Sequence, residues 1–197
     1  QHQPGLAAVA ADQLQRAVDV LAGFRMKADP RGAGLGEIGA LATATSTMAA
    51  IQASGHENGE LDRKAVMNLL KSVMQAHDMA FGSWFAEAGD SFDGKQAEFV
   101  DSNEFAGNAK GEFSPYWTKT ESGDIHFSTF AIDPAASWFA LSAQSEKGAI
   151  TPPYTAEGTA VPTTLTSITS PVLSGGKLIG ITGIDVSLAS LSAELSK

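Results

Sequence analysis

The stretch from Thr163 to Leu188 restricts the fold of this 197-residue chain more than any other. Apolar residues alternate with Thr and Ser on both sides of Ser174-Gly175-Gly176. This predicts two strands joined by a tight turn, because glycine reaches positive φ without a Cβ clash. Pro171 cannot donate to a strand ladder, so it indicates a strand end or a sheet edge. After Asp185 the leucines recur at helical spacing up to Leu195, which predicts a helix directly after the second strand.

The hairpin also carries a specific phrase. Residues 170–188 read Ser-Pro-Val-x-x-Gly-Gly-Lys-x-x-Gly-x-x-Gly-Ile-Asp-Val-Ser-Leu, which resembles the closing hairpin of Cache sensor domains, the extracytoplasmic ligand-binding modules of bacterial chemoreceptors and sensor kinases. Further short motifs follow the order expected of that family. They are Gly82-Ser83-Trp84-Phe85, Phe92-Asp93-Gly94, Pro115-Tyr116-Trp117 and Pro153-Tyr154.

The hydrophobic periodicity upstream indicates an α+β fold. Apolar stripes predict helices, and short β-rich runs predict strands. We expect helices at Leu6–Ala28, Glu37–Ala53 and Leu61–Met79, with a break at Asp29–Gly36. Strands are expected at Phe81–Glu87, Phe113–Lys119 and Ile125–Phe130, a short helix or turn at Trp138–Ala143, and a loop at Ala149–Pro162. On the third helix, Asp62, Arg63 and Lys64 are expected on the solvent side.

The resemblance implies long N-terminal helices packed on a PAS-like antiparallel sheet, with a C-terminal helix after the last strand. We divide the chain into an N-terminal helix with a glycine-rich break, residues 1–39, and a Cache-type ligand-binding module, residues 40–197. In the family the first helix pairs with its dimer mate, which implies a homodimer; packing of Leu6–Ala28 on its own sheet is the alternative.

Composition excludes several classes of function. A net charge of -9 with only 13 Lys and Arg argues against nucleic-acid binding. The absence of cysteine removes thiol catalysis, disulfides and cysteine-ligated zinc. The four histidines lack metal-ligand spacing, and no nucleophile elbow or P-loop occurs. We therefore predict no cofactor, no metal and no enzymatic activity. The alternative is a hydrolase or isomerase that uses Asp93 or Asp133.

The resemblance implies a periplasmic sensor module of a membrane-anchored methyl-accepting chemotaxis receptor, with a histidine kinase input domain as the alternative. The sequence leaves open whether the chain is a single module or the distal half of a double Cache receptor. A module without any ligand is a third interpretation. The lack of a signal-peptide pattern at the start favours an excised part of a longer receptor.

Aromatic and acidic residues concentrate between positions 80 and 155, and together they predict a small-molecule pocket. The arginine and aspartate that hold amino acids in the family are replaced here around Phe113 and after Tyr154. Acids near aromatic faces suit an amine or a quaternary ammonium compound such as a betaine, while an amino acid or organic acid stays open through Lys119. The candidate contacts are Trp84, Phe92, Asp93, Phe113, Tyr116, Trp117, Lys119, Phe130, Asp133, Trp138 and Tyr154.

Two residues carry specific expectations. Tyr116 and Trp117 must face opposite sides of their strand, and the family motif favours Trp117 as the ligand contact. Asp185 is expected to be structural, because a carboxylate at the end of a strand can accept backbone N–H bonds and cap the helix that follows.

Overall fold

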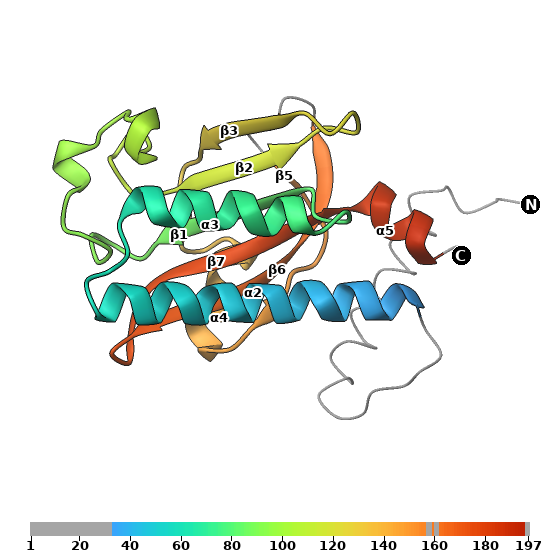
Figure 1. The fold of residues 1–197 in the computed structure, drawn as a ribbon, viewed down its shortest axis with the longest axis horizontal. Coiled ribbons are helices and arrows are strands. Elements are labelled where there is room, and N and C mark those ends of the chain that lie inside the picture. Colours follow the sequence, from blue (N-terminus) through green and yellow to red (C-terminus); the bar gives the residue numbers. More distant parts are fainter. Residues whose placement is uncertain (1–32, 157–158, 160–161, 196–197) are drawn as a thin grey trace, which may run out of the picture.

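The predicted hairpin lies at the centre of a seven-stranded antiparallel sheet in the computed structural model, which describes residues 33–156, 159 and 162–195 (Figure 1). Its arms are β6 (Thr163–Ser174) and β7 (Lys177–Ser187), and Gly175 and Gly176 both take positive φ in the turn. The remaining strands are β1 (Gly82–Glu87), β2 (Pro115–Lys119), β3 (Ile125–Thr129), β4 (Ala149–Ile150) and β5 (Tyr154–Ala156). Their order is β3-β2-β1-β7-β6-β4, and β5 also pairs with β6.

Helices cover both faces of this sheet. On one face lie α2 (Ala33–Glu57) and α3 (Arg63–Ala76), and on the other lies α4 (Ser137–Ser145) (Figure 1). The Asp62 carboxylate caps α3 by accepting from the Ala65 N–H at 2.8 Å. The short 3₁₀ turns η1 (Gln96–Glu98) and η2 (Asn103–Phe105) lie between β1 and β2, and α5 (Leu188–Leu195) follows β7 without a break. The α+β prediction is therefore confirmed.

Strand alternation divides the core into two clusters. On the helical face, Phe85, Ile168 and Ile184 pack with buried residues of α2 and α3. On the opposite face, Trp84 and Ile181 pack with Phe139 of α4. Neighbouring residues along a strand point to opposite faces of the sheet. Each central strand therefore contributes side chains both to the closed core beneath α2 and α3 and to a second, more polar surface on the α4 side.

The structure corrects several boundaries. The helix α2 begins at Ala33, so Gly34 and Gly36 are helical where a break was expected. The division of the chain at residue 39 stays a prediction, and α2 spans that position. The expected loop from Ala149 contains β4 and β5, because both strands find partners along β6. Pro171 lies beyond the β4 pairing, where only β7 flanks β6. The helix expected at 6–28 lies outside the described residues.

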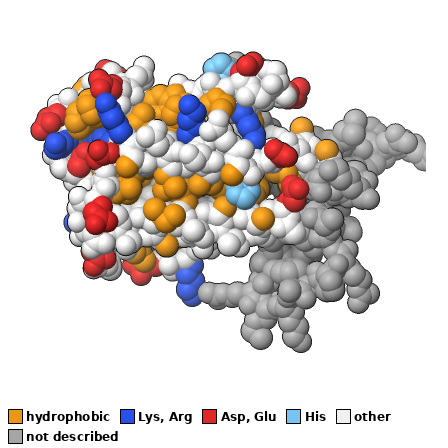
Figure 2. Space-filling model, in the orientation of Figure 1, with side chains coloured by type: hydrophobic (Ala, Val, Ile, Leu, Met, Phe, Trp, Pro, Cys, Tyr) orange, Lys and Arg blue, Asp and Glu red, His pale blue; other side chains and the backbone are white. Residues whose placement is uncertain are grey.

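Side chains of both charge signs lie on the helical face (Figure 2). Figure 2 shows hydrophobic side chains in the furrow between α2 and α3, with acidic side chains mostly at its margins. Within the described parts of the chain, no helix has the length and apolar character that crossing a membrane requires.

Candidate ligand-binding cavity

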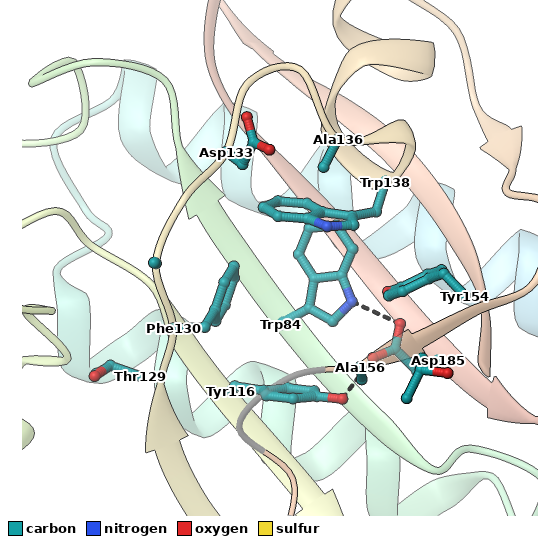
Figure 3. Close-up of a pocket in the computed structure, with 12 residues that line it drawn as sticks. Trp84, Tyr116, Thr129, Phe130, Asp133, Ala136, Trp138, Tyr154, Ala156 and Asp185 are labelled. Carbon is teal, nitrogen blue, oxygen red and sulfur yellow. Dashed lines mark hydrogen bonds between the residues drawn. The ribbon is translucent and has the colours of Figure 1, made fainter. Parts of the chain in front are cut away.

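A cavity of about 540 Å³ opens on the α4 side of the sheet (Figure 3). It lies within the usual size range of small-molecule sites. Its walls come from β1, β2, β3, β5, β7 and α4, and from the segment between β3 and α4. The lining consists of Trp84, Tyr116, Thr129, Phe130, Ala131, Asp133, Ala136, Trp138, Tyr154, Thr155, Ala156 and Asp185.

Aromatic rings form the walls of this cavity. Trp84, Phe130 and Trp138 meet in pairs at centroid distances of 5.5–6.0 Å, with interplanar angles of 79–80°. The Tyr116 ring lies 5.8 Å from Phe130 at 74°, and Figure 3 shows Tyr154 on the side nearest Asp185. Rings set edge to face in this way leave faces turned in several directions, an arrangement that recognises quaternary ammonium groups in aromatic cages.

Asp185 forms the polar floor. The Trp84 indole N–H donates to Oδ1 at 2.8 Å, the Ser167 hydroxyl donates to Oδ1 at 2.6 Å, and the Tyr116 hydroxyl donates to Oδ2 at 2.7 Å. Burial raises the pKa of Asp185 above its usual value of 3.8, while these same hydrogen bonds act to lower it. None of the described residues that line the cavity is Lys or Arg.

The expectation that Asp185 caps the final helix is wrong. The Ser187 hydroxyl accepts the Ser190 N–H at 3.1 Å and caps the start of α5 instead. The Asp185 side chain turns to the cavity because its strand position pairs with Gly82 and Ser167, on the same face as Trp84.

Glycines of the hairpin phrase make room for the cavity wall. Gly183 lies directly opposite Trp84, and a Cβ there would come within 2.3 Å of the indole ring. Gly82 lies beside the Tyr116 ring, where a Cβ would come within 2.8 Å of the ring. Both positions therefore require glycine for steric reasons, and the motif around Gly183 sets where Trp84 lies.

The predicted contacts Trp84, Tyr116, Phe130, Asp133, Trp138 and Tyr154 all line the cavity. Asp185 was not predicted as a lining residue, and neither was Ser167 as its hydroxyl partner. Strand alternation could have placed Asp185 beside Trp84 once the register of β1 against β7 was known. No local signal indicated Ser167.

The other predicted aromatics, Phe92 and Phe113, are buried in the helical core, where their ring centroids lie 4.6 Å apart. Arg63 joins them there, although a solvent position was expected; the structure corrects this, since only 3% of Arg63 is exposed. Its guanidinium carbon lies 4.6 Å from the Phe99 ring centroid and 4.9 Å from that of Phe113. We call Arg63, Asp93, Phe99 and Phe113 the Arg63 cluster.

Asp93 is held within that cluster. The Arg63 Nε donates to Oδ2 at 2.8 Å and Nη2 donates to Oδ1 at 3.0 Å. Burial acts to raise the pKa of Asp93, but the Arg63 hydrogen bonds and charge outweigh it, so the pKa is lowered. Both carboxylate oxygens are therefore engaged with a charged partner.

An acidic group near this cluster combines Glu87, Asp90 and Asp93, whose oxygens lie within 4.8 Å of one another. Glu87 accepts the backbone N–H groups of Phe92 at 2.9 Å and Phe113 at 2.8 Å, and the Gln96 amide at 3.1 Å. Burial raises the pKa of Glu87. These carboxylates already have protein partners, so their geometry is explained without an ion.

Trp117 and Lys119 lie away from the cavity. As expected, Tyr116 and Trp117 face opposite sides of β2, but it is Tyr116 that faces the cavity; the Trp117 indole N–H donates to the Met67 carbonyl of α3 at 2.9 Å. Lys119 donates to the His77 carbonyl at 2.7 Å beyond the end of α3, and burial lowers its pKa. It borders a separate surface pocket near α5.

A family model described as "Methyl-accepting chemotaxis protein-like, first PDC sensor domain" matches residues 66–193. The chain belongs to this family. This confirms the Cache, or PDC, resemblance and identifies the domain as a chemoreceptor-type sensor module. The family and its structural neighbours are sensor domains and not enzymes.

Known sensor domains share the fold. The solved structure of Methyl-accepting Chemotaxis protein X is 44% identical to this chain, with a TM-score of 0.78, covering 96% of this chain and 65% of that one. Methyl-accepting chemotaxis protein TlpQ of Pseudomonas aeruginosa is 24% identical over 143 residues, which are 66% of this chain and 20% of TlpQ. The Pseudomonas aeruginosa amino acid chemoreceptor PctC, solved with GABA, is 14% identical with a TM-score of 0.54, covering 83% of this chain and 63% of that one. This PDC domain therefore spans less than two thirds of these relatives.

Proposed function

We propose that this PDC domain binds a small organic cation, an amine or a quaternary ammonium compound, in the aromatic cavity. The observation that carries the proposal is Asp185, an acid that is 2% exposed, lies in an aromatic cavity and has no basic partner in the lining. A buried carboxylate without a counterion is costly, so a bound cation would offset that cost.

Ring faces add to the attraction. A cation over an aromatic face gains about 0.5–2 kcal/mol, with the larger value where water is excluded. Asp133, at the exposed edge of the lining, adds a second negative charge near the mouth. Its Oδ1 accepts the Ala135 N–H at 2.9 Å, which orients the carboxylate. The PctC structure holds GABA, whose ammonium group is of the same chemical class.

We propose that the domain works on the periplasmic side of a membrane-anchored receptor and signals through its terminal helices. Asp185 lies in β7, which continues directly into α5. A second route leads to α2, because the Thr182 hydroxyl donates to the Trp84 carbonyl at 3.0 Å and accepts from the Gln52 amide at 3.3 Å. Ligand binding at the floor therefore acts on groups tied to the C-terminal helix α5 and to α2, the first described helix, and shifts a conformational equilibrium. The N-terminal helix expected at 6–28 lies outside the described residues.

A thermal-shift screen followed by calorimetry tests the ligand class. The probes are tetramethylammonium, choline, putrescine, glycine betaine, GABA and succinate, each at a matched concentration. A ligand at 100 times its Kd stabilises the folded state by about 2.7 kcal/mol. We expect cationic probes to raise the melting temperature. If succinate alone does so, the proposal of a cation site is wrong.

A further inference from the structure

A buried hydroxyl that the sequence did not single out connects two groups at the cavity. The Ser167 Oγ lies 2.6 Å from the Asp185 Oδ1 and 2.7 Å from the Tyr154 hydroxyl oxygen. Ser167 is fully buried on β6. It therefore links the acid of the floor to a phenol of the wall.

The direction of this chain of hydrogen bonds follows from counting protons. A serine hydroxyl has one proton, and an ionised carboxylate only accepts. The Ser167 proton is thus used on Asp185, so the contact with Tyr154 requires the phenol to donate to Ser167. The Tyr116 hydroxyl and the Trp84 indole N–H also donate their protons to Asp185.

Neighbouring strands hold Ser167 in this position. Its backbone N–H donates to the Thr151 hydroxyl at 2.9 Å, and its carbonyl accepts the Thr151 N–H at 3.0 Å. The Thr166 hydroxyl also donates to the Thr151 carbonyl at 2.7 Å. Both Ser167 and Thr151 are inaccessible to solvent. These bonds hold the backbone of Ser167 in place, and its buried hydroxyl contacts Asp185 and Tyr154.

The consequence is a cavity with two different ends. At the floor, the protons of Tyr154, Tyr116 and Trp84 are donated within the protein, so the described side chains there offer a ligand acceptors and no free donor. Three side-chain donors of the lining have no hydrogen-bond partner among the described residues. They are the Trp138 indole and the Thr129 and Thr155 hydroxyls, and they lie in the more exposed part of the lining.

We propose that Ser167 is a specificity-determining positioning residue, which withholds the Tyr154 proton from the ligand and so makes the floor select ammonium groups against carboxylates. The inference rests on the proposed cation site and adds to it a cause of discrimination. A ligand carboxylate at the floor would meet Asp185 and find no free donor among the described side chains. A zwitterion must therefore bind with its cation inward and its carboxylate at the mouth.

A matched pair of probes tests this directly. Tetramethylammonium and glycine betaine have similar methylated ammonium groups, and only the second carries a carboxylate. We would measure both dissociation constants by calorimetry and compare their ratio across variants. Ser167→Ala removes the acceptor of the Tyr154 proton, which can then turn into the cavity and donate to the carboxylate of glycine betaine bound in the reverse orientation, with its carboxylate at the floor. We expect the ratio to shift at least tenfold in favour of glycine betaine.

Further variants separate this effect from general damage. Tyr154→Phe alone should leave the ratio within twofold of the wild type, because the proton it removes was already withheld from the ligand. The double variant should lose the gain of Ser167→Ala. Ser142→Ala is the matched control, since Ser142 is another buried serine that bonds to Thr169 at 2.7 Å and does not line the cavity.

The outcomes are distinguishable. A ratio within twofold of the wild type in Ser167→Ala overturns the role of Ser167, and so does a gain that survives in the double variant. A tenfold change in Tyr154→Phe alone overturns it as well, and this outcome is readable even if Ser167→Ala does not fold. If neither probe binds the wild-type domain, the cation site itself is wrong, and the inference is wrong with it.

Discussion

The Arg63 cluster and the cavity both combine aromatic rings with an aspartate. They differ because the Arg63 cluster contains a guanidinium, whereas the described lining of the cavity contains no basic side chain. In the Arg63 cluster, α3 supplies a guanidinium that lies against two phenyl rings and bonds both oxygens of Asp93. In the cavity, aromatic rings surround Asp185, and its described hydrogen-bond donors, Trp84, Tyr116 and Ser167, are all neutral. The first arrangement is complete within the protein. The second has the partners of a cation and leaves space for one, and this difference is the physical basis of the proposed cation site.

Arg63→Ala should have the largest effect, and the effect should be on stability. Removing the guanidinium leaves a partly buried carboxylate without its partner, which we expect to cost about 3 kcal/mol of unfolding free energy. Urea denaturation gives the value. Lys64→Ala is the control, because the Lys64–Glu104 pair at 2.7 Å is exposed and such pairs contribute below about 1 kcal/mol. Equal losses in both variants would show that the Arg63 cluster is not structural.

Asp185→Asn should have the opposite balance of effects to Arg63→Ala, with a loss of ligand affinity and no loss of stability. The amide keeps the shape of the floor and removes the charge, so affinity for tetramethylammonium should fall by about 2 kcal/mol, roughly 30-fold. The unfolding free energy of the ligand-free domain should stay the same or rise, because an uncompensated buried charge is removed. Calorimetry and urea denaturation measure the two effects. A large loss of stability with unchanged affinity would return Asp185 to a purely structural role.

The pH dependence of binding should follow the ionisation of Asp185. Its pKa is raised in the folded state, so its contribution to stability is present below the unfolded value of 3.8 and is lost as the pH rises through the folded pKa. The cation binds the ionised form. Affinity should therefore be full above the raised pKa and fall about tenfold per pH unit below it. Titration calorimetry with tetramethylammonium measures the profile, and Asp185→Asn should flatten it.

Trp117→Phe should have the smallest effect on binding. The substitution removes the indole N–H bond to Met67 and trims the ring that Lys71 contacts, which we expect to cost about 1 kcal/mol of stability. Affinity for tetramethylammonium should stay within twofold, because Trp117 faces α3. A clear loss of affinity at unchanged melting temperature would instead support the ligand contact that the family motif favours.

The sequence by itself determined the β6–β7 hairpin, the helix–sheet architecture and the aromatic residues that the cavity draws on. These features depend on local chemistry: glycines at positive φ, apolar periodicity, and strand alternation that separates Tyr116 from Trp117. The phrase around Gly183 also contained the steric requirement for Trp84, although its reason became visible only with the ring in place.

Only the tertiary structure decided which aromatic and acidic residues share a space. Phe113 and Tyr116 are close in sequence, yet they lie on opposite sides of the sheet. Arg63 appeared to belong on a polar helix face and is buried, because η1 and η2 fold over it. Asp185 and Ser167 meet because the register of β7 sets them opposite each other. Such pairings depend on strand order and register between distant segments, which local periodicity does not encode.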